Sequence, residues 1–209
     1  LQKIKLRKIK NFKKKFYKIP IYSNKLIFNE ANLFLDWYIP KIINKNKKFK
    51  IKRKLKKIII SLIKKIQLPN TTFVHRDFHV SNLIIKKNKI SVIDSQDAVY
   101  GNIAYDLASL IDDVRLKTSK NIKEMIYQNY LNLNKKKINK IKFKNDFEIL
   151  SVLRNLKIIG IFTRLATRDK KKKYLKLIPY AWNLIELRIK NNDIFKDLKH
   201  CLDINFPKK

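Results

Sequence analysis

The order of apolar and polar residues along this chain predicts a mostly helical protein with one small β-hairpin. Over residues 51–66 isoleucine and leucine recur every three or four positions with lysine between them, which is the pattern of an amphipathic helix. A similar pattern over residues 145–167 predicts a second long helix. An amphipathic basic helix can also lie on a membrane, but we interpret the apolar stripe of residues 51–66 as core.

Further helical patterns surround these two. Ser23 is expected to cap a helix that runs to about Ile39, where Pro40 ends or kinks it. Residues 44–50 are expected to be a basic linker. Additional helices are predicted near residues 104–114, 120–132, 173–190 and 193–202.

Two short apolar runs in the middle of the chain predict a β-hairpin. Leu83–Ile85 and Ile90–Ile93 read as its strands, with residues 86–89 as the connection and Asn88 as the turn former. Neighbouring strands lie about 4.8 Å apart, so Asn82 and Asp94 are expected to face each other across the open end of the hairpin. A further short strand is predicted around residues 72–74.

Three oxygen-bearing side chains around this hairpin suggest a chemistry. Asp77 precedes Asn82 in the loop that leaves the short strand, and Asp94 follows the hairpin. One amide oxygen and one carboxylate can hold Mg²⁺, while a separate carboxylate orients a hydroxyl, and phosphoryl transfer from ATP requires these groups. The sequence therefore predicts Asp77 as the catalytic base and Asn82 and Asp94 as magnesium ligands.

The charge of the chain is strongly positive. There are 51 lysine and arginine residues against 16 aspartate and glutamate residues, which gives a formal charge of +35. Such an excess suggests a nucleic-acid partner. However, the surplus is nearly all lysine, is spread over the whole chain and accompanies an excess of isoleucine and asparagine, so we attribute it to codon bias and expect no specific nucleic-acid partner.

The remaining composition narrows the cellular setting. The single cysteine, Cys201, excludes an internal disulfide and suits a reducing compartment; we interpret it as a small buried apolar residue. No apolar run is long enough to span a bilayer, and no signal peptide is visible. We therefore expect a cytoplasmic protein that does not engage a membrane, and the sequence gives no indication of its oligomeric state.

The spacing from His75 through Asp77 to Asn82 matches the catalytic loop of the protein-kinase-like fold. Asp94 is followed by Ser-Gln-Asp where a protein kinase has Phe-Gly, and no Ala-Pro-Glu segment appears downstream. The chain instead resembles the aminoglycoside phosphotransferase-like small-molecule kinases. Their motifs are matched at Asp77, His79, Asn82, Asp94, Asp97, Gly101 and Tyr105–Ala108.

Within that superfamily, the stretches 74–79 and 92–98 are most similar to the anomeric N-acetylmuramate/N-acetylglucosamine 1-kinases of cell-wall sugar recycling. The resemblance covers residues 22–190. It implies an α+β fold over residues 22–205, namely a protein-kinase-like C-terminal lobe with a small hairpin that carries the metal ligands. It also implies ATP and Mg²⁺ as cofactors and the anomeric hydroxyl of an amino sugar as acceptor.

The resemblance further implies supporting residues. Asp106 is expected to hold the catalytic loop through backbone N–H groups or Arg76. Glu30 matches the family's helix acid before Leu-Phe-x-x-Trp-Tyr, which implies a sugar contact; we expect instead an exposed or N-terminal-half helix charge. Around the base and the metal ligands we expect His75, Arg76, His79, Asp97 and Asp106, with Asp97 alternatively in the wall of the pocket. Candidates for the sugar and its carboxylate-bearing lactyl group, each equally well an ion pair joining helices, are Asp113, Arg115, Arg154, Asn155 and Arg164.

One part of a kinase is not recognisable in this sequence. The two glycines, Gly101 and Gly160, cannot belong to a Gly-rich phosphate loop, and no strand lysine with a glutamate partner is visible before Leu26. We therefore expect a C-terminal lobe whose activity needs an N-terminal lobe, with residues 1–21 as a basic leader or a remnant of the segment that connects the lobes.

Two other functions remain open on the sequence. The acceptor could be an aminoglycoside or a choline-like alcohol, and several Tyr or Trp rings around an anionic wall near Asp77 would favour the latter. From a different class, the chain could be a non-catalytic kinase-like lobe that binds polyanions through its basic surface.

Overall fold

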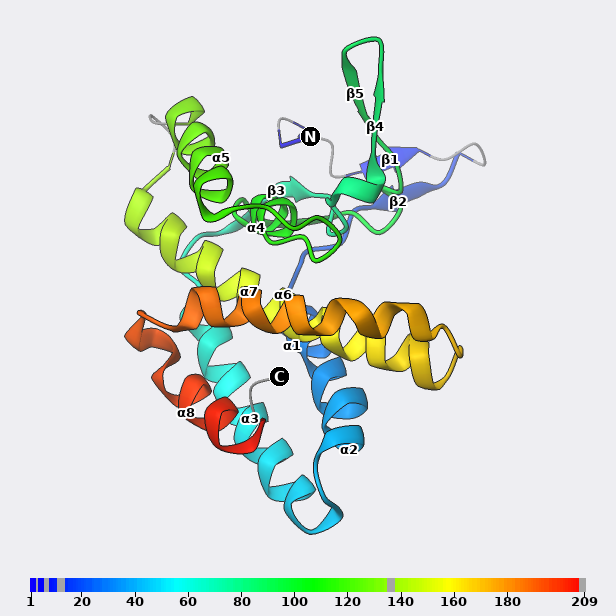
Figure 1. Ribbon diagram of the computed structural model, residues 1–209. Helices are drawn as coiled ribbons and strands as arrows, with labels where there is room; N and C mark the ends of the chain where they lie inside the picture. Colours follow the sequence, from blue (N-terminus) through cyan, green and yellow to red (C-terminus); the bar gives the residue numbers. More distant parts are fainter. Residues whose placement is uncertain (3, 6–7, 11–13, 135–137, 207–209) are drawn as a thin grey trace. The chain divides into compact units, whose positions relative to one another are not determined.

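The computed structural model describes residues 1–2, 4–5, 8–10, 14–134 and 138–206. The chain folds into two compact units, each discontinuous in sequence: Leu1–Ser23 with Gln67–Phe147, and Asn24–Ile66 with Glu148–Lys209 (Figure 1). The long helix α6 (Lys140–Thr167) contributes to both. The described chain is mostly helical with small sheets, as predicted for an α+β protein.

The described strands of the first unit form three two-stranded antiparallel sheets. Every residue of β6 is buried, so the strand shows no alternation of apolar and polar residues, and this explains why the sequence pattern did not reveal it. The expected leader is partly strand, although its residues 3, 6–7 and 11–13 lie outside the described part of the chain. The strand pairs are β1 (Lys8–Lys10) with β2 (Phe16–Lys18), β3 (Asn70–Val74) with β6 (Val99–Asn102), and β4 (Leu83–Lys86) with β5 (Lys89–Val92).

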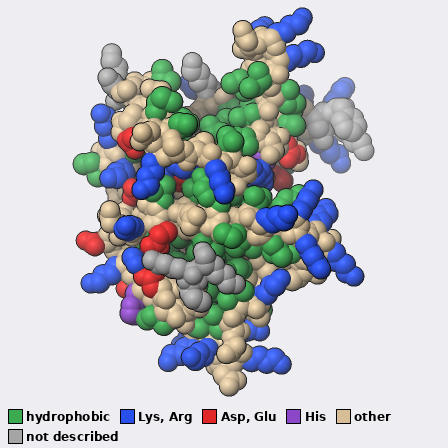
Figure 2. Space-filling model, viewed as in Figure 1, with side chains coloured by type: hydrophobic (Ala, Val, Ile, Leu, Met, Phe, Trp, Pro, Cys, Tyr) green, Lys and Arg blue, Asp and Glu red, His purple; other side chains and the backbone are tan. Residues whose placement is uncertain are grey.

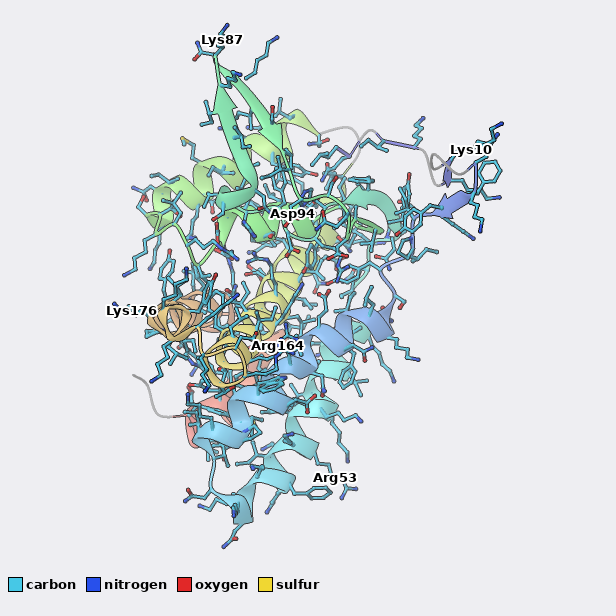
Figure 3. The ribbon with its side chains drawn as sticks, turned by 90° about the vertical axis from the view of Figure 1, so that its right-hand side faces the viewer. Lys10, Arg53, Lys87, Asp94, Arg164 and Lys176 are labelled. Carbon is cyan, nitrogen blue, oxygen red and sulfur yellow. The ribbon has the colours of Figure 1, made fainter. Side chains whose placement is uncertain are left out.

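The β4–β5 hairpin has a tighter turn than its sequence suggested. Lys86 pairs with Lys89, which leaves only Lys87 and Asn88 in the connection. Both have positive φ, 46° and 59°, as in the type I′ turn whose twist matches that of paired strands. The hairpin projects from its unit (Figure 1), with Lys87 at its tip and Asp94 at its base (Figure 3).

A buried carboxylate on α6 binds the segment that precedes β3 and the last residue of β6. Asp146, fully buried on α6, accepts hydrogen bonds from the backbone N–H groups of Gln67 (2.9 Å) and Leu68 (2.7 Å) and from Nδ2 of Asn102 (2.6 Å). The start of β3, the end of β6 and α6 are therefore joined at one point. The other helices of this unit are α4 (Tyr105–Ile111) and α5 (Lys120–Leu133).

The second unit is helical. Its predicted first helix is interrupted by a π-helical turn, η1, in which the N–H of Ile39 bonds to the carbonyl of Phe34. This wider turn directly precedes Pro40, whose ring nitrogen has no hydrogen to donate. The helix continues past Pro40 to Ile42, so Pro40 does not end it. The helical segments are α1 (Asn24–Leu33), η1 (Phe34–Tyr38), α2 (Ile39–Ile42), α3 (Lys45–Lys64), η3 (Lys172–Leu177), α7 (Ile178–Ile189), η4 (Asp193–Phe195) and α8 (Lys196–Asn205).

One expectation for this unit is wrong and two others are confirmed. No linker lies at residues 44–50, because α3 already begins at Lys45. Lysine is a good helix former, so a run of lysines is no evidence against a helix. The apolar stripe of residues 51–66 is core, as predicted, with Leu55 and Ile59 fully buried. Cys201 is also fully buried. Among the described residues, no helix has the length and apolar character needed to cross a membrane.

Candidate active site

The loop after β3 is anchored by a buried histidine. His75 is fully buried, and its Nε2 lies 2.9 Å from the carbonyl oxygen of Ile93, so Nε2 carries the proton and donates it there. The N–H of Ile93 in turn donates to the carbonyl oxygen of Asn82 (3.1 Å). Ile93, the residue before Asp94, therefore bonds through its carbonyl group to His75 and through its N–H to Asn82.

The side chain of Asn82 is oriented by the loop itself. Its Nδ2 donates to the backbone carbonyl of Asp77 (2.9 Å), which also accepts the N–H of His79 (3.0 Å). Because the amide nitrogen is engaged, the amide oxygen is the atom left for a ligand, and no donor in the described part of the chain pairs with it. The carboxylate of Asp77 is half-buried and makes no hydrogen bond or ion pair with any described residue.

Asp94 is placed differently from the expected arrangement. Leu83 pairs with Val92, so the residue opposite Asn82 is Ile93, and Asp94 lies one position further on. The expected direct pairing of Asn82 with Asp94 was therefore offset by one residue. Asp94 is exposed, has φ 69°, and its Oδ1 accepts Nε2 of Gln96 (2.6 Å). Left-handed backbone is unfavourable for a residue with a Cβ, and such residues cluster at functional sites.

The start of the loop is held by Asp106, the second residue of α4. Its buried carboxylate accepts the N–H groups of His75 (2.8 Å to Oδ2) and Arg76 (3.2 Å to Oδ1). The backbone of Arg76 is also in the left-handed region, with φ 71°. Its Nη1 donates to the backbone carbonyl of Asp97 (3.0 Å), so the exposed carboxylate of Asp97 takes no part in that contact, and its guanidinium lies 5.8 Å from the ring centre of Tyr22.

The end of the loop is held by Asp113. This carboxylate is 1% exposed; its Oδ2 accepts the N–H of Val80 (3.1 Å), and its Oδ1 accepts both the N–H and Nη1 of Arg115 (3.1 Å each). The ion pair of Asp113 with Arg115 joins near neighbours in the sequence. The contact to Val80 could not be predicted, because no local pattern marks it.

Three of the predicted site residues lie in the second unit, on α6. Arg154 and Asn155 are buried, and Nδ2 of Asn155 donates to the carbonyl of Ser151 (3.0 Å) while its Oδ1 has no partner among the described residues. Arg164 is partly exposed. Glu30 was expected to be an exposed or N-terminal-half helix charge, and this is wrong: it lies in the C-terminal half of α1 and is buried, 3.0 Å from Nζ of the buried Lys157.

The second unit also contains a cavity of about 340 Å³ that the sequence did not reveal. Rings of Tyr38, Trp182 and Phe206 line it together with the acidic residues Glu186 and Asp203. Nε1 of Trp182 donates to the hydroxyl of Tyr38 (3.2 Å), and burial raises the pKa of Tyr38 while this hydrogen bond lowers it in part. None of the predicted site residues is among those that line the cavity.

The donor set of the first unit suits magnesium. The amide oxygen of Asn82 and the carboxylate of Asp94 are hard oxygen donors, and Mg²⁺ is commonly bound by one or two side chains of this kind together with substrate phosphates. No group of three or more His, Cys, Asp or Glu side chains within the described residues forms a closed metal site. Lysine and arginine side chains are scattered over the visible face (Figure 2) and form no single basic patch there.

Comparisons with known proteins agree with these observations. Residues 24–137 match the Phosphotransferase enzyme family. An N-acetylmuramate/N-acetylglucosamine kinase of Neisseria meningitidis is 31% identical over 172 residues, which are 80% of this chain and 52% of that protein. Kinases of the same name from Pseudomonas aeruginosa (28% over 193 residues, 88% and 56%) and Caulobacter vibrioides (33% over 122 residues, 56% and 33%) are also similar.

These matches differ in how much of each protein they cover. The chain spans about half the length, or less, of the curated relatives it matches. The family match covers more than half of the chain and includes the loop, the hairpin and α4. The chain therefore belongs to the phosphotransferase enzyme family.

Proposed function

We propose that this chain carries the base and the magnesium ligands of an ATP-dependent phosphotransferase that acts on a small-molecule hydroxyl. The observation that carries the proposal is the half-buried, unpaired carboxylate of Asp77 in the same loop as Asn82, whose amide oxygen is also open. The names of the similar kinases support N-acetylmuramate or N-acetylglucosamine as the acceptor, and the motif resemblance at residues 74–79 and 92–98 suggests its anomeric hydroxyl.

Asp77 is the base in this proposal. Its carboxylate accepts a hydrogen bond from the sugar hydroxyl and so directs the hydroxyl oxygen at the γ-phosphorus of ATP. As the new oxygen–phosphorus bond forms, the bond between that phosphorus and the leaving oxygen of ADP breaks, and the hydroxyl proton passes to Asp77. General-base assistance of this kind contributes about 10²–10⁴-fold to the rate.

Asn82 and Asp94 are the metal ligands. The hydrogen bond from Nδ2 of Asn82 to the carbonyl of Asp77 fixes which end of the amide is available, and the contact from Gln96 holds Oδ1 of Asp94. Magnesium, when bound, supplies positive charge against the phosphates of ATP. The protein contributes the fixed positions of the two oxygen ligands, which the hydrogen bonds of His75 and Ile93 connect to the base loop.

The proposal is tested by Asp77→Asn in the complete protein, with sugar-dependent release of ADP from ATP as the assay. We expect turnover to fall by at least about 10²-fold with nucleotide binding retained, because the amide cannot take the proton. Glu124→Gln, which neutralises an exposed carboxylate on α5, is the matched control and should keep parental turnover. Turnover of Asp77→Asn within tenfold of the parent would refute the role of Asp77.

The acceptor is tested separately. N-acetylmuramate, N-acetylglucosamine, an aminoglycoside and choline are compared as acceptors with the parental protein. ADP release that depends on an aminoglycoside or choline but on neither amino sugar would reject the sugar assignment while leaving the phosphotransferase chemistry intact.

A further inference from the structure

We propose that Asp113 is a positioning residue that holds the turn bearing the magnesium ligand Asn82, and not a ligand of the sugar. This inference rests on the proposed function for the role of Asn82. The contact itself, between the carboxylate of Asp113 and the N–H of Val80, rests on the structure alone.

The turn that carries Asn82 needs an external partner. It is a single 3₁₀ turn, η2 (Val80–Asn82), and the preceding residue, His79, provides no side-chain cap. The first N–H groups of any helical turn have no partner within the turn and require one elsewhere. Oδ2 of Asp113, 33 positions away in sequence, accepts the N–H of Val80 at 3.1 Å and so acts as the missing cap.

The remaining contacts of Asp113 argue against a role in binding substrate directly. A carboxylate has about four acceptor positions, and three donors already use this one: the N–H of Val80 and the N–H and Nη1 of Arg115. The residue is 1% exposed. At most one acceptor position is left, and solvent barely reaches the carboxylate, so an incoming sugar hydroxyl has no open approach to it.

Displacement of the turn would move the metal ligand. Asn82 lies two residues after Val80; its N–H bonds to the carbonyl of His79 and its side chain to the carbonyl of Asp77. Asp106 holds the other end of the same loop at His75 and Arg76. Two carboxylates seven residues apart, one in α4 and one just after it, therefore fix the loop on both sides of Asp77.

The test uses two variants that remove the same hydrogen bond from its two ends in the complete protein. Asp113→Asn weakens the acceptor. Val80→Pro removes the donor, and it fits the backbone, because proline is favoured at the first position of a helical turn and His79 has the extended conformation (φ −138°, ψ 165°) that residues before proline adopt. Glu124→Gln is the matched control for the change in charge.

Two readouts are measured. Amide hydrogen exchange of the segment 78–84 should rise in both variants relative to the helix of residues 120–133. The magnesium concentration for half-maximal turnover should rise about tenfold, as is usual when a residue that orients a metal ligand is lost, while the KM for the sugar stays near the parental value. In the double variant the two effects on magnesium should not add, because both remove one contact.

Several results would overturn the inference: unchanged exchange in residues 78–84, a raised sugar KM with an unchanged magnesium requirement, or additive effects in the double variant. If Asp113→Asn shows fast amide hydrogen exchange along the whole chain because it does not fold, the exchange and magnesium measurements on Val80→Pro alone decide the question. If the parental protein transfers no phosphoryl group to any acceptor, the proposed function fails, and the exchange measurement still decides whether Asp113 holds the turn.

Discussion

Replacement of Gly160 by alanine should test how closely two helices of the second unit approach each other. A Cβ added at Gly160 would lie 2.3 Å from the carbonyl carbon of Leu33, 2.5 Å from its oxygen and 2.5 Å from the nitrogen of Phe34. All three are backbone atoms at the junction of α1 with the π-helical turn η1, so no rotation of a side chain can relieve the overlap.

The expected cost follows from two opposing terms. Alanine favours the helix over glycine by about 1 kcal/mol. Ordinary van der Waals contact begins near 3.4 Å, so the two backbones must separate by about 1 Å, and overpacking of this kind typically costs 1–3 kcal/mol. With neighbours such as Leu156 and Ile159 fully buried, we expect a value near the upper end and a net loss of about 2 kcal/mol.

The assay is urea unfolding followed by tryptophan fluorescence. Both tryptophans, Trp37 in η1 and Trp182 in α7, belong to the second unit, so the signal reports the unit in which the change is made. The midpoint should fall at an unchanged m-value.

Gly101→Ala provides the matched comparison. Its added Cβ would meet side-chain atoms, Cγ2 of Val74 at 3.1 Å and Cβ of Tyr22 at 3.2 Å, and relief of this overlap needs a displacement of only a few tenths of an ångström. Its destabilisation, followed by circular dichroism, should be smaller. A Gly160→Ala protein as stable as the parent, or more stable, would show that the helices can separate freely and that the argument from backbone contact is wrong.

Two further predictions concern the first unit. Asp146→Asn should lower the free energy of unfolding by about 2–3 kcal/mol. The fully buried carboxylate accepts four hydrogen bonds, from Gln67, Leu68, Asn102 and the neighbouring Asn145, and the amide would turn its N–H groups toward some of those donors. An unchanged urea midpoint by circular dichroism would contradict this. Burial, opposed by a hydrogen bond to Gln2 and assisted by the charge of Asp106, raises the pKa of Tyr130 from 10.0 to about 12. Between these two values only the unfolded chain loses the proton, so stability should fall as pH rises through that window, and Tyr130→Phe should remove this part of the decline; parallel pH profiles for parent and variant would exclude it.

The long helices and the hairpin followed from local pattern. The apolar stripes of α3 and α6 repeat at helical spacing, and the strands β4 and β5 are short apolar runs on either side of a turn-forming asparagine. Local pattern did not predict β6, because both faces of that strand are buried. It also did not predict the start of α3, because the run of lysines there suggested a linker.

The sequence by itself determined which residue types stand near the hairpin and, through their spacing, the family to which the chain belongs. Only the tertiary structure decided how they are held: the pairing of Leu83 with Val92 sets Asp94 one residue beyond Asn82, and the carboxylates of Asp106 and Asp113 reach back across about thirty positions to the loop. The reason is physical. A helix or a turn forms from interactions within a few residues, whereas the partner of a buried N–H group depends on which distant acceptor the packed core brings within hydrogen-bond range.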